Sequence, residues 1–590
     1  MIFGRTINKY YLRYLPMLLF GLFALILVDY FQLKIPELYR VIINGMNGGT
    51  VEIAGEVREF NIDFLLDEIC RPMLVVILAM VIGRFLWRVC FFGAGIKMEA
   101  DLRARMFRNA RTLSQQYYQV NKVGNMMALF TNDLSAVQEC FGWGVMMLFD
   151  ALFLGGLSIY KMAVMDWKLT LLSLIPMALL LIAGSIVGQV MTKKWNARQA
   201  AYSDISDFSQ ESFSGIAVIK AFVKEFLELM SFRKLNRKNE EANVDYTKAS
   251  TLLHIVVTLF VESVICVILG YGGYLVYIER FDAGQLVEFI GYFTAIVWPI
   301  TALSELIEMR SRGKASLDRI DELLSAEPDV KDSEGVREVE SIRGDIEFKN
   351  LTFRYPCAEN DALSGVSFKI NAGEGVGIIG KTGSGKTTLV DLILRTYNVP
   401  RGVLFVDGVD VNEIPIRTLR AYSAYVPQDN FLFSDTIASN ISFAVGSADT
   451  ESIIRAATLS DVHDNISEFP EGYQTVLGER GVTVSGGQKQ RISIARALVK
   501  EASILILDDS VSAVDTATER VILDNLKNSR KGKTTVLIAH RVSTVEGMDK
   551  IVFIDDGRVV AVGTHAELCE RCPEYKTMVD LQRLEDKEGV

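Results

Sequence analysis

The sequence lacks the excess of basic side chains that binding to a nucleic-acid backbone requires. Lysine and arginine number 62 against 72 aspartate and glutamate residues, which leaves a net charge of −10. This charge provides no positive field for DNA or RNA, so we expect no nucleic-acid partner. A secreted disulfide framework is not expected either. The cysteines are odd in number and scattered, at positions 70, 90, 140, 266, 357, 569 and 572.

The N-terminal sequence also lacks the features of a cleavable signal peptide. The first apolar run, LPMLLFGLFALILV, is followed by no small-residue cleavage site, so we expect it to be retained. With 590 residues, 50% of them hydrophobic, the chain is too long for one ordinary domain and too apolar for a disordered one. Its long apolar runs lie in the first half, and the second half has the composition of a soluble α/β domain.

The first half predicts six membrane spans, because a bilayer core needs about 20 mostly apolar residues per helix. The third and fourth spans are separated only by Met165, Asp166 and Trp167, which predicts a tight helical hairpin. The six segments are approximately 14–36, 70–94, 138–163, 168–192, 251–277 and 284–309.

The charges between the spans predict the orientation. Residues 45–68 carry six acidic side chains and one basic one, Arg58, whereas segment 97–136 carries six basic side chains and segment 193–250 carries ten. The acidic loop is therefore expected outside, and the two long basic segments, together with both termini, in the cytosol.

The two basic segments are too long for structureless loops, and they have helical composition with almost no proline. We expect the membrane helices to continue into the cytosol and to turn at short tips. The candidate tips are 131–134 (TNDL) and 214–217 (SGIA).

Five ionisable residues fall inside the predicted spans, where such side chains are costly and usually face an interior or a cavity. Glu262 lies in the middle of a span, in LFVESVICVIL. Either it lines a substrate cavity, or it pairs with an arginine of the second span for structural reasons. The other four residues are Asp29, Arg84, Arg88 and Asp150.

The second half begins after a polar linker and alternates short β-type runs with helical stretches, which predicts a largely parallel sheet covered by helices. Its sharpest motif follows the strand run GVGII and opens the helical run TTLVDLIL, as a P-loop requires. There, backbone amides and the helix N-terminus would hold phosphates, Lys386 would neutralise charge and the Thr387 hydroxyl would bind Mg²⁺. The nucleotide-binding residues of this loop are Gly380, Lys381, Thr382, Gly383, Ser384, Gly385, Lys386, Thr387 and Thr388.

Two further motifs complete the pattern. The apolar run 504–507 (ILIL) ends in Asp508, whose carboxylate can hold the Mg²⁺ of a nucleotide. A second anion site is predicted where Ser485 would cap a helix whose first turn carries two glycines. Its residues are Ser485, Gly486, Gly487 and Gln488. One nucleotide needs one phosphate cradle, so the second cradle indicates a partner molecule.

Together, the motifs GKTGSGKT, VSGGQ, ILILDD, YVPQD and LIAHR resemble the nucleotide-binding domain of ATP-binding-cassette (ABC) transporters. The six spans with long cytosolic helices resemble the membrane domain of the exporter type. The resemblance implies a helical membrane domain followed by an α/β P-loop ATPase domain with a helical subdomain. We expect a membrane domain over 1–325, a linker over 326–343, an ATPase domain over 344–580 and a C-terminal tail over 581–590.

The resemblance also implies roles for single residues. Tyr355 would stack on adenine, Gln428 would sense Mg²⁺ and contact the cytosolic tips, and His540 would touch the γ-phosphate. Asp515 would belong to a loop that crosses between two ATPase domains. Two such domains would enclose two ATP molecules, each between one P-loop and the opposite SGGQ motif, and the tips would act as coupling helices.

The sequence departs from the family at Asp509, where a glutamate usually polarises the attacking water. Aspartate is one methylene shorter, and a misplacement of about 1 Å can cost on the order of 100-fold in rate. The pattern resembles the degenerate half of a heterodimeric exporter whose partner supplies the glutamate. The alternative is a homodimer with slow hydrolysis.

We therefore expect ATP-driven export of small amphipathic molecules, such as drugs, lipids or peptides, with ATP and Mg²⁺ as cofactors and a second half-transporter as partner. An importer, a lipid flippase or an ATP-gated regulator or channel are the alternatives. The expected location is a bacterial cytoplasmic membrane. The pair Cys569 and Cys572 with His565 offers only three ligands, so a structural zinc site is not expected.

Overall fold

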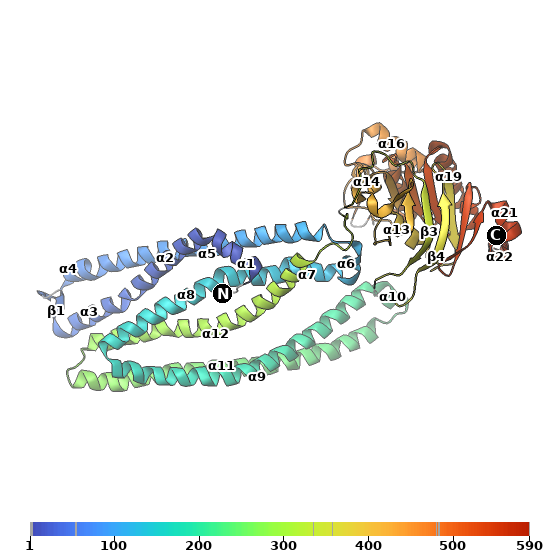
Figure 1. Cartoon of the computed structure of the whole chain (residues 1–590). Helices are drawn as coiled ribbons and strands as arrows, with labels where there is room; N and C mark the ends of the chain where they lie inside the picture. Colours follow the sequence, from blue (N-terminus) through green and yellow to red (C-terminus); the bar gives the residue numbers. More distant parts are fainter. Residues whose placement is uncertain are drawn as a thin grey trace. The chain divides into compact units, whose positions relative to one another are not determined.

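The computed structural model describes residues 4–53, 56–333, 335–356, 358–478, 481 and 484–588. The chain divides into two compact units. The first comprises Met1–Ala110 and Gly124–Ser325, and the second comprises Arg111–Val123 and Ala326–Val590. Figure 1 shows the long helices of the first unit in blue to green and the sheets of the second in yellow to red.

Long helices form the first unit because apolar residues continue over many turns with few breaks. Its elements are α1 (Arg5–Arg13), α2 (Leu15–Gln32), α3 (Lys34–Gly48), β1 (Thr50–Ile53), β2 (Glu56–Glu59), α4 (Ile62–Phe64), η1 (Leu65–Cys70), α5 (Arg71–Ala110), η2 (Leu129–Asp133), α8 (Leu134–Met165), α9 (Trp167–Ser214), α10 (Ile216–Ala221), α11 (Glu225–Tyr277) and α12 (Ala283–Ser325). Between α5 and η2 lie α6 (Gln115–Val120), in the second unit, and α7 (Val123–Ala128).

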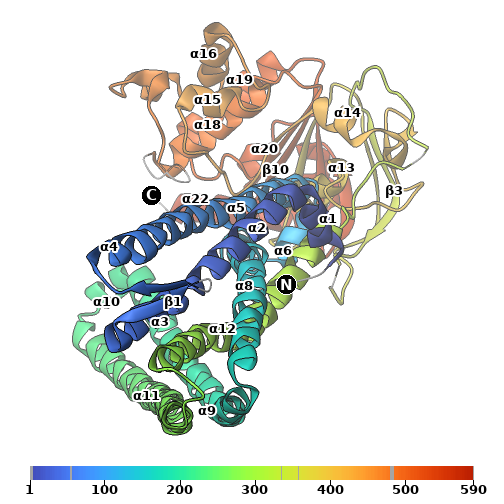
Figure 2. The same cartoon turned by 90° about the vertical axis from the view of Figure 1, so that its left-hand side faces the viewer.

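The helices pack in pairs, α2 along α5, α8 along α12 and α9 along α11, as Figures 1 and 2 both show. Apolar side chains fill the space between α8 and α12, among them the buried Leu154 and Phe293. The tight hairpin between the third and fourth predicted spans is confirmed. There, α8 ends at Met165 and the Asp166 side chain caps α9 by accepting a hydrogen bond from the Leu169 N–H at 2.7 Å.

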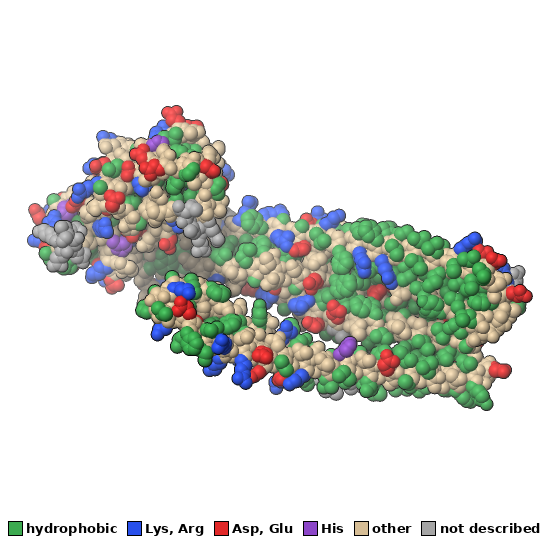
Figure 3. All heavy atoms as spheres, turned by 180° about the vertical axis from the view of Figure 1, so that it is seen from behind, with side chains coloured by type: hydrophobic (Ala, Val, Ile, Leu, Met, Phe, Trp, Pro, Cys, Tyr) green, Lys and Arg blue, Asp and Glu red, His purple; other side chains and the backbone are tan. Residues whose placement is uncertain are grey.

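Five helical stretches of the described chain are long and apolar enough to cross a membrane, one fewer than the six predicted. They are Leu15–Gly48, Ile62–Ala110, Val123–Met165, Glu225–Tyr277 and Ala283–Ser325. The predicted span 168–192 falls on α9, of which Trp167–Leu179 is a shorter apolar helix. The side chains of 180–187 and 189 lie outside the described residues, so the sixth span stays a prediction. Hydrophobic side chains cover much of the helical unit on the face shown in Figure 3.

The continuation of the membrane helices is confirmed, since α9 runs unbroken to Ser214 and α11 begins at Glu225. A tip at 214–217 is also confirmed: α9 ends there and the short α10 begins at Ile216.

The predicted tip at 131–134 is wrong, because this segment is helical and leads without a turn from η2 into α8. Its polar residues suggested a turn, but Asp133 is buried and accepts hydrogen bonds from Ser316 at 2.7 Å and from Arg319. These partners on α12 satisfy the carboxylate inside a helix. The chain turns earlier instead, around α6.

The second unit contains two sheets. A six-stranded sheet has the order β12-β11-β5-β10-β9-β8, in which only β12 is antiparallel to its neighbour, and a four-stranded antiparallel sheet has the order β4-β3-β6-β7. The strands are β3 (Ile346–Phe353), β4 (Leu363–Ile370), β5 (Gly375–Gly380), β6 (Leu404–Val406), β7 (Val409–Asp410), β8 (Ser423–Val426), β9 (Ile504–Asp508), β10 (Thr534–Ala539), β11 (Lys550–Asp555) and β12 (Arg558–Gly563).

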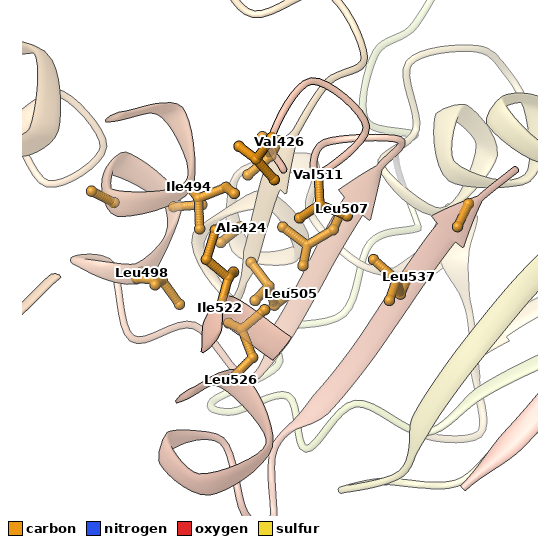
Figure 4. Packing of buried hydrophobic residues seen from close by; sticks show 14 of the residues in the cluster. Ala424, Val426, Ile494, Leu498, Leu505, Leu507, Val511, Ile522, Leu526 and Leu537 are labelled. Carbon is orange, nitrogen blue, oxygen red and sulfur yellow. The ribbon is translucent and has the colours of Figure 1, made fainter. Parts of the chain in front are cut away.

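Helices cover the larger sheet and form a helical subdomain. They are α13 (Lys386–Ile393), η3 (Val411–Glu413), α14 (Ile416–Ala421), α15 (Ile437–Ser442), α16 (Thr450–Leu459), α17 (His463–Ser467), η4 (Gly472–Gln474), α18 (Gly486–Leu498), α19 (Thr516–Ser529), α20 (Val542–Val545), α21 (His565–Arg571) and α22 (Pro573–Glu588). Strands β8, β9 and β10 consist largely of buried apolar residues that meet α18 and α19 in one core (Figure 4). This core holds the strand ends in fixed positions.

Candidate nucleotide-binding site

The parallel strands β5, β10, β9 and β8 end at the same edge of the sheet, and each ends at a predicted motif. The P-loop follows β5, His540 follows β10, Asp508 closes β9 and Gln428 lies just beyond β8. The register sets Ile538 beside Asp508 and Ala539 beside Ile379. Ligands bind outside the carboxyl ends of parallel strands, so this edge is the candidate site.

The P-loop is shaped by two glycines with left-handed backbone, Gly383 with φ +82° and Gly385 with φ +94°. Side chains rarely adopt this conformation, and a Cβ at Gly385 would also lie 2.7 Å from the carbonyl oxygen of Ala362. The loop then passes into α13, whose N-terminal N–H groups have no helical partners and favour an anion.

Lys386 closes the P-loop from inside. Its side chain is buried, and Nζ donates to the carbonyl oxygens of Gly380 at 2.9 Å and Lys381 at 2.8 Å. Burial lowers the pKa of Lys386, while the charges of Asp508 and Asp509 oppose this shift. The ammonium group thus lies near two carboxylates, and phosphate oxygens could replace the loop carbonyl oxygens as its hydrogen-bond acceptors.

Asp508 has the surroundings of a metal ligand. It is 1% exposed, and within the described part of the chain its Oδ2 atom has no hydrogen-bond partner. Burial raises the pKa of Asp508, whereas a hydrogen bond from Thr387 and the nearby charges of Lys386 and His540 act against the rise. A buried carboxylate with a free oxygen beside a threonine hydroxyl fits a Mg²⁺ ion carried by a nucleotide.

The backbone of Asp509 adopts a left-handed conformation, with φ +47°. Its N–H donates to the Ile538 carbonyl oxygen at 3.0 Å, and its own carbonyl oxygen accepts from Ser512 Oγ at 2.9 Å. Its Oδ2 atom accepts a long hydrogen bond of 3.5 Å from Nε2 of Gln428. The structure therefore brings Gln428 and Asp509 together across β8 and β9.

Gln490 is a residue of this region that the sequence analysis missed. It is 3% exposed, and its amide donates to the Asp509 carbonyl oxygen at 3.2 Å and accepts from the Ala513 N–H at 3.0 Å. It ties α18 to the segment after β9. No spacing or composition distinguishes this glutamine from an ordinary helical one, because its role depends on the opposite backbone.

The SGGQ motif begins α18 as predicted. Ser485 and Gln488 form a reciprocal capping box: the Gln488 N–H donates to Ser485 Oγ at 3.3 Å and the Ser485 N–H donates to Gln488 Oε1 at 3.0 Å. A Cβ at Gly486 would meet nothing within 4 Å. Among the described residues no hydrogen bond or ion pair joins 485–488 to the P-loop, so the structure does not bring these two cradles together.

Asp515 and Tyr355 are engaged within the domain. Asp515 caps α19 by accepting from the N–H groups of Ala517 and Thr518, and the Thr518 backbone hydrogen bond lowers its pKa. The Tyr355 hydroxyl donates to Oγ1 of Thr388 at 2.9 Å, and burial raises the pKa of Tyr355 to about 12.

Asp391 lies on α13 behind the P-loop, where the Tyr355 hydroxyl also reaches its Oδ2 atom, at 3.3 Å. Burial raises the pKa of Asp391 to about 6, and Asp508 adds to the rise. A proton bound more tightly in the folded state stabilises the fold at low pH, and this contribution is lost as pH rises through about 6. We expect Asp391→Asn to remove this pH dependence.

The measurement is the melting temperature of the nucleotide-free protein between pH 5 and pH 8. The wild type should lose stability across this range relative to Asp391→Asn. The exposed Asp524→Asn is the matched control and should follow the wild type. Parallel profiles for the wild type and Asp391→Asn would contradict the expectation.

The ionisable residues of the membrane spans occupy different surroundings. Asp29 and Asp150 are buried at 1% and 8% exposure, and Asp150 accepts a hydrogen bond of 2.7 Å from Nε1 of Trp298. Arg84 donates to Gln32, and the Arg88 guanidinium lies over the Trp87 ring. Glu262 is exposed, and in the described chain it forms no ion pair with either arginine, so the interpretation as a structural pair finds no support.

A sheet edge with P-loop geometry, joined in one chain to helices of membrane-spanning length, defines a membrane protein with a nucleotide-binding domain. Comparison with known proteins identifies the family. The model of the ABC transporter transmembrane region matches residues 6–300, and that of the ABC transporter matches residues 363–512. The chain belongs to the ABC transporter family.

Relatives match over nearly the full length. The chain is 36% identical to the "Probable multidrug resistance ABC transporter ATP-binding/permease protein YheI" of Bacillus subtilis (strain 168), covering 98% of this chain and 97% of that protein. It is 32% identical to the "ATP-dependent lipid A-core flippase" of Syntrophus aciditrophicus (strain SB), over 88% and 86% of the two chains. A bacterial Atm1-family ABC exporter with ATP bound superposes with a TM-score of 0.77 at 25% identity, covering 98% of each chain.

Family membership makes the chain an exporter-type half-transporter, with a multi-pass membrane domain fused to one ATP-binding domain. ABC exporters of this fold act as dimers.

Proposed function

We propose that the chain is one half of a dimeric ABC exporter that moves small amphipathic molecules out of a bacterial cell at the expense of ATP. The observation that carries the proposal is the separation of the two phosphate cradles. Each is fully formed, yet among the described residues no bond joins 485–488 to the P-loop of the same chain. A second ATPase domain would supply the missing half of each nucleotide site.

The residues at the sheet edge have complementary roles in this proposal. Lys386 binds the β- and γ-phosphates, and Thr387 with the free oxygen of Asp508 would hold Mg²⁺. The bound ion would neutralise charge on the phosphates. The charge of His540 acts against the rise in the pKa of Asp508, and this proximity supports the proposed contact of His540 with the γ-phosphate. Gln428 orients the Asp509 carboxylate through its amide.

The structure supports impaired hydrolysis at this chain's own site. Asp509 cannot compensate for its missing methylene by moving its backbone, because Ile538, Ser512 and Gln490 bind its N–H and carbonyl oxygen. Its carboxylate therefore stays about 1 Å short of a glutamate's reach, a displacement that costs on the order of 100-fold. We propose that a different half-transporter supplies the glutamate in a heterodimer. The alternative, a homodimer, would hydrolyse ATP slowly.

The tip around α10 is the proposed coupling element. Val218, Phe222 and Phe226 are 61%, 70% and 74% exposed, an unusual apolar surface for a segment whose charges predict a cytosolic location. In this proposal the hydrophobic tip docks against the ATPase domain of the other half. ATP-driven closure of the two ATPase domains would then move α9 and α11.

We expect Val218→Asp to uncouple transport from ATP binding, because a carboxylate in an apolar docking contact must lose its water. Vesicle transport should fall at least tenfold, a loss of about 1.4 kcal/mol or more at the contact, while nucleotide binding is retained. Val57→Asp, at a valine that is 70% exposed on β2, is the matched control. Equal transport by the two variants would argue against a role for this tip.

Export is tested with inside-out vesicles that contain the chain together with its partner half. ATP-dependent accumulation of a cationic amphipathic dye supports the exporter, whereas a gated channel would only equilibrate the dye. The flippase is the second candidate, because a relative at 32% identity is named as one. ATP-dependent movement of a labelled lipid between leaflets, without dye accumulation, would favour it. Accumulation in right-side-out vesicles would indicate an importer.

A further inference from the structure

The loop that carries His540 is held by a side chain from the end of the protein. Gln582 lies on α22, in the stretch for which the sequence predicts a tail, and the structure continues α22 to Glu588. Its Nε2 atom donates to the His540 carbonyl oxygen at 2.7 Å, and its Oε1 atom accepts from the Val542 N–H at 2.7 Å. A single amide thus bridges the backbone on both sides of Arg541.

These two hydrogen bonds satisfy backbone groups that have no partner within the loop itself. Strand β10 ends at Ala539 and α20 begins at Val542, and its N-cap Arg541 provides no side-chain cap. The His540 carbonyl oxygen and the Val542 N–H would therefore need water or another partner. The amide of Gln582 satisfies both groups at once, as a paired strand would.

Helix α22 is firmly anchored before it reaches the loop. Tyr575 is fully buried, its ring lies edge-on to Phe553 of β11, and its hydroxyl is 2.9 Å from Nδ1 of His565. Val579 is 3% exposed in the domain core, and Gln582 follows it by three residues on the same helix face. The packing of α22 against the sheet therefore fixes the position of Gln582.

The loop is also held from a second side. Glu519 of α19 is 3% exposed and accepts a hydrogen bond from Thr544 on α20. Contacts from α19 and α22 restrict the backbone around His540, so the position of its imidazole depends on both.

We propose that Gln582 is a positioning residue for His540, through which the C-terminal helix sets the rate of ATP hydrolysis. The inference rests on the proposed contact of His540 with the γ-phosphate. Gln582→Met keeps the length of the side chain and removes both hydrogen bonds. It should lower kcat about tenfold and leave the KM for ATP unchanged, because the nucleotide is bound mainly by the P-loop.

The test uses the full-length chain with Asp509→Glu, which provides a glutamate at the site, and compares His540→Ala, Gln582→Met and the double variant. If Gln582 acts through His540, the double variant will be no slower than His540→Ala alone. A further loss in the double variant, or a changed KM for ATP, would overturn the inference in favour of a general structural role. So would normal turnover by Gln582→Met.

A second variant and one control separate the remaining outcomes. Gln582→Glu keeps the acceptor for Val542 but cannot donate to His540, and it should also lower kcat. Arg583→Gln changes the exposed neighbouring side chain and should match the parent. If His540→Ala itself has no effect, the proposed role of His540 fails. If only the Gln582 variants have none, the inference about Gln582 fails.

Discussion

Asp509→Glu should raise ATP hydrolysis by the purified chain by about 100-fold, the factor expected when a displaced catalytic group regains its position. The wild-type carboxylate cannot advance, because the backbone of Asp509 is bound on both sides, by Ile538 through its N–H and by Gln490 through its carbonyl oxygen. The glutamate side chain restores the missing methylene without moving these contacts.

Steady-state phosphate release at saturating Mg²⁺-ATP measures this effect. Asp509→Asn is the informative comparison, since it keeps the size of the side chain and removes the carboxylate, and it should show no gain. Rapid turnover by the wild-type chain alone, with no increase in Asp509→Glu, would refute the heterodimer in which the partner supplies the glutamate.

Lys386→Ala should reduce ATP-driven transport to background and weaken nucleotide binding by about tenfold to 100-fold, the usual loss for a hydrogen bond to a charged group. In the structure, the buried Nζ atom donates hydrogen bonds to the carbonyl oxygens of Gly380 and Lys381. These neutral partners can be exchanged for phosphate oxygens of opposite charge. Alanine leaves the phosphates without that cation in a site already lined by two carboxylates.

Retention of labelled ATP by the detergent-solubilised protein and dye accumulation in vesicles are the two measurements. Lys369→Ala, which removes a half-exposed lysine paired with Asp345 at the surface, is the control and should behave like the wild type. Unimpaired pumping by Lys386→Ala would remove the basis for ATP-driven transport at this site.

Much of the ATPase domain could be predicted because its chemistry depends on short contiguous motifs. A P-loop needs its glycines, lysine and threonine at fixed local spacing, and strand runs such as 504–507 are recognised from four buried apolar residues. The turn at Asp556 and Gly557 depends on equally local chemistry: both residues have positive φ, and the structure pairs β11 with β12 around them.

Predictions that relied on polarity without knowledge of the partners were less successful. The segment 131–134 contains residues typical of turns, yet Ser316 and Arg319 on α12 satisfy Asp133 and the helix continues. Glu262 was weighed against Arg84 and Arg88, but α11 packs along α9 and not along the helix that carries the arginines. Tertiary partners decided both cases.

The sequence by itself determined the motifs that hold ATP, the apolar helices and the aspartate where the family has a glutamate, since each depends on neighbouring residues. Only the tertiary structure showed that β5, β10, β9 and β8 bring these motifs to one edge, and that Gln490 and Gln582 hold the backbone of Asp509 and His540. A glutamine side chain that binds a backbone group far along the chain leaves no periodic pattern, because its partner is chosen by packing.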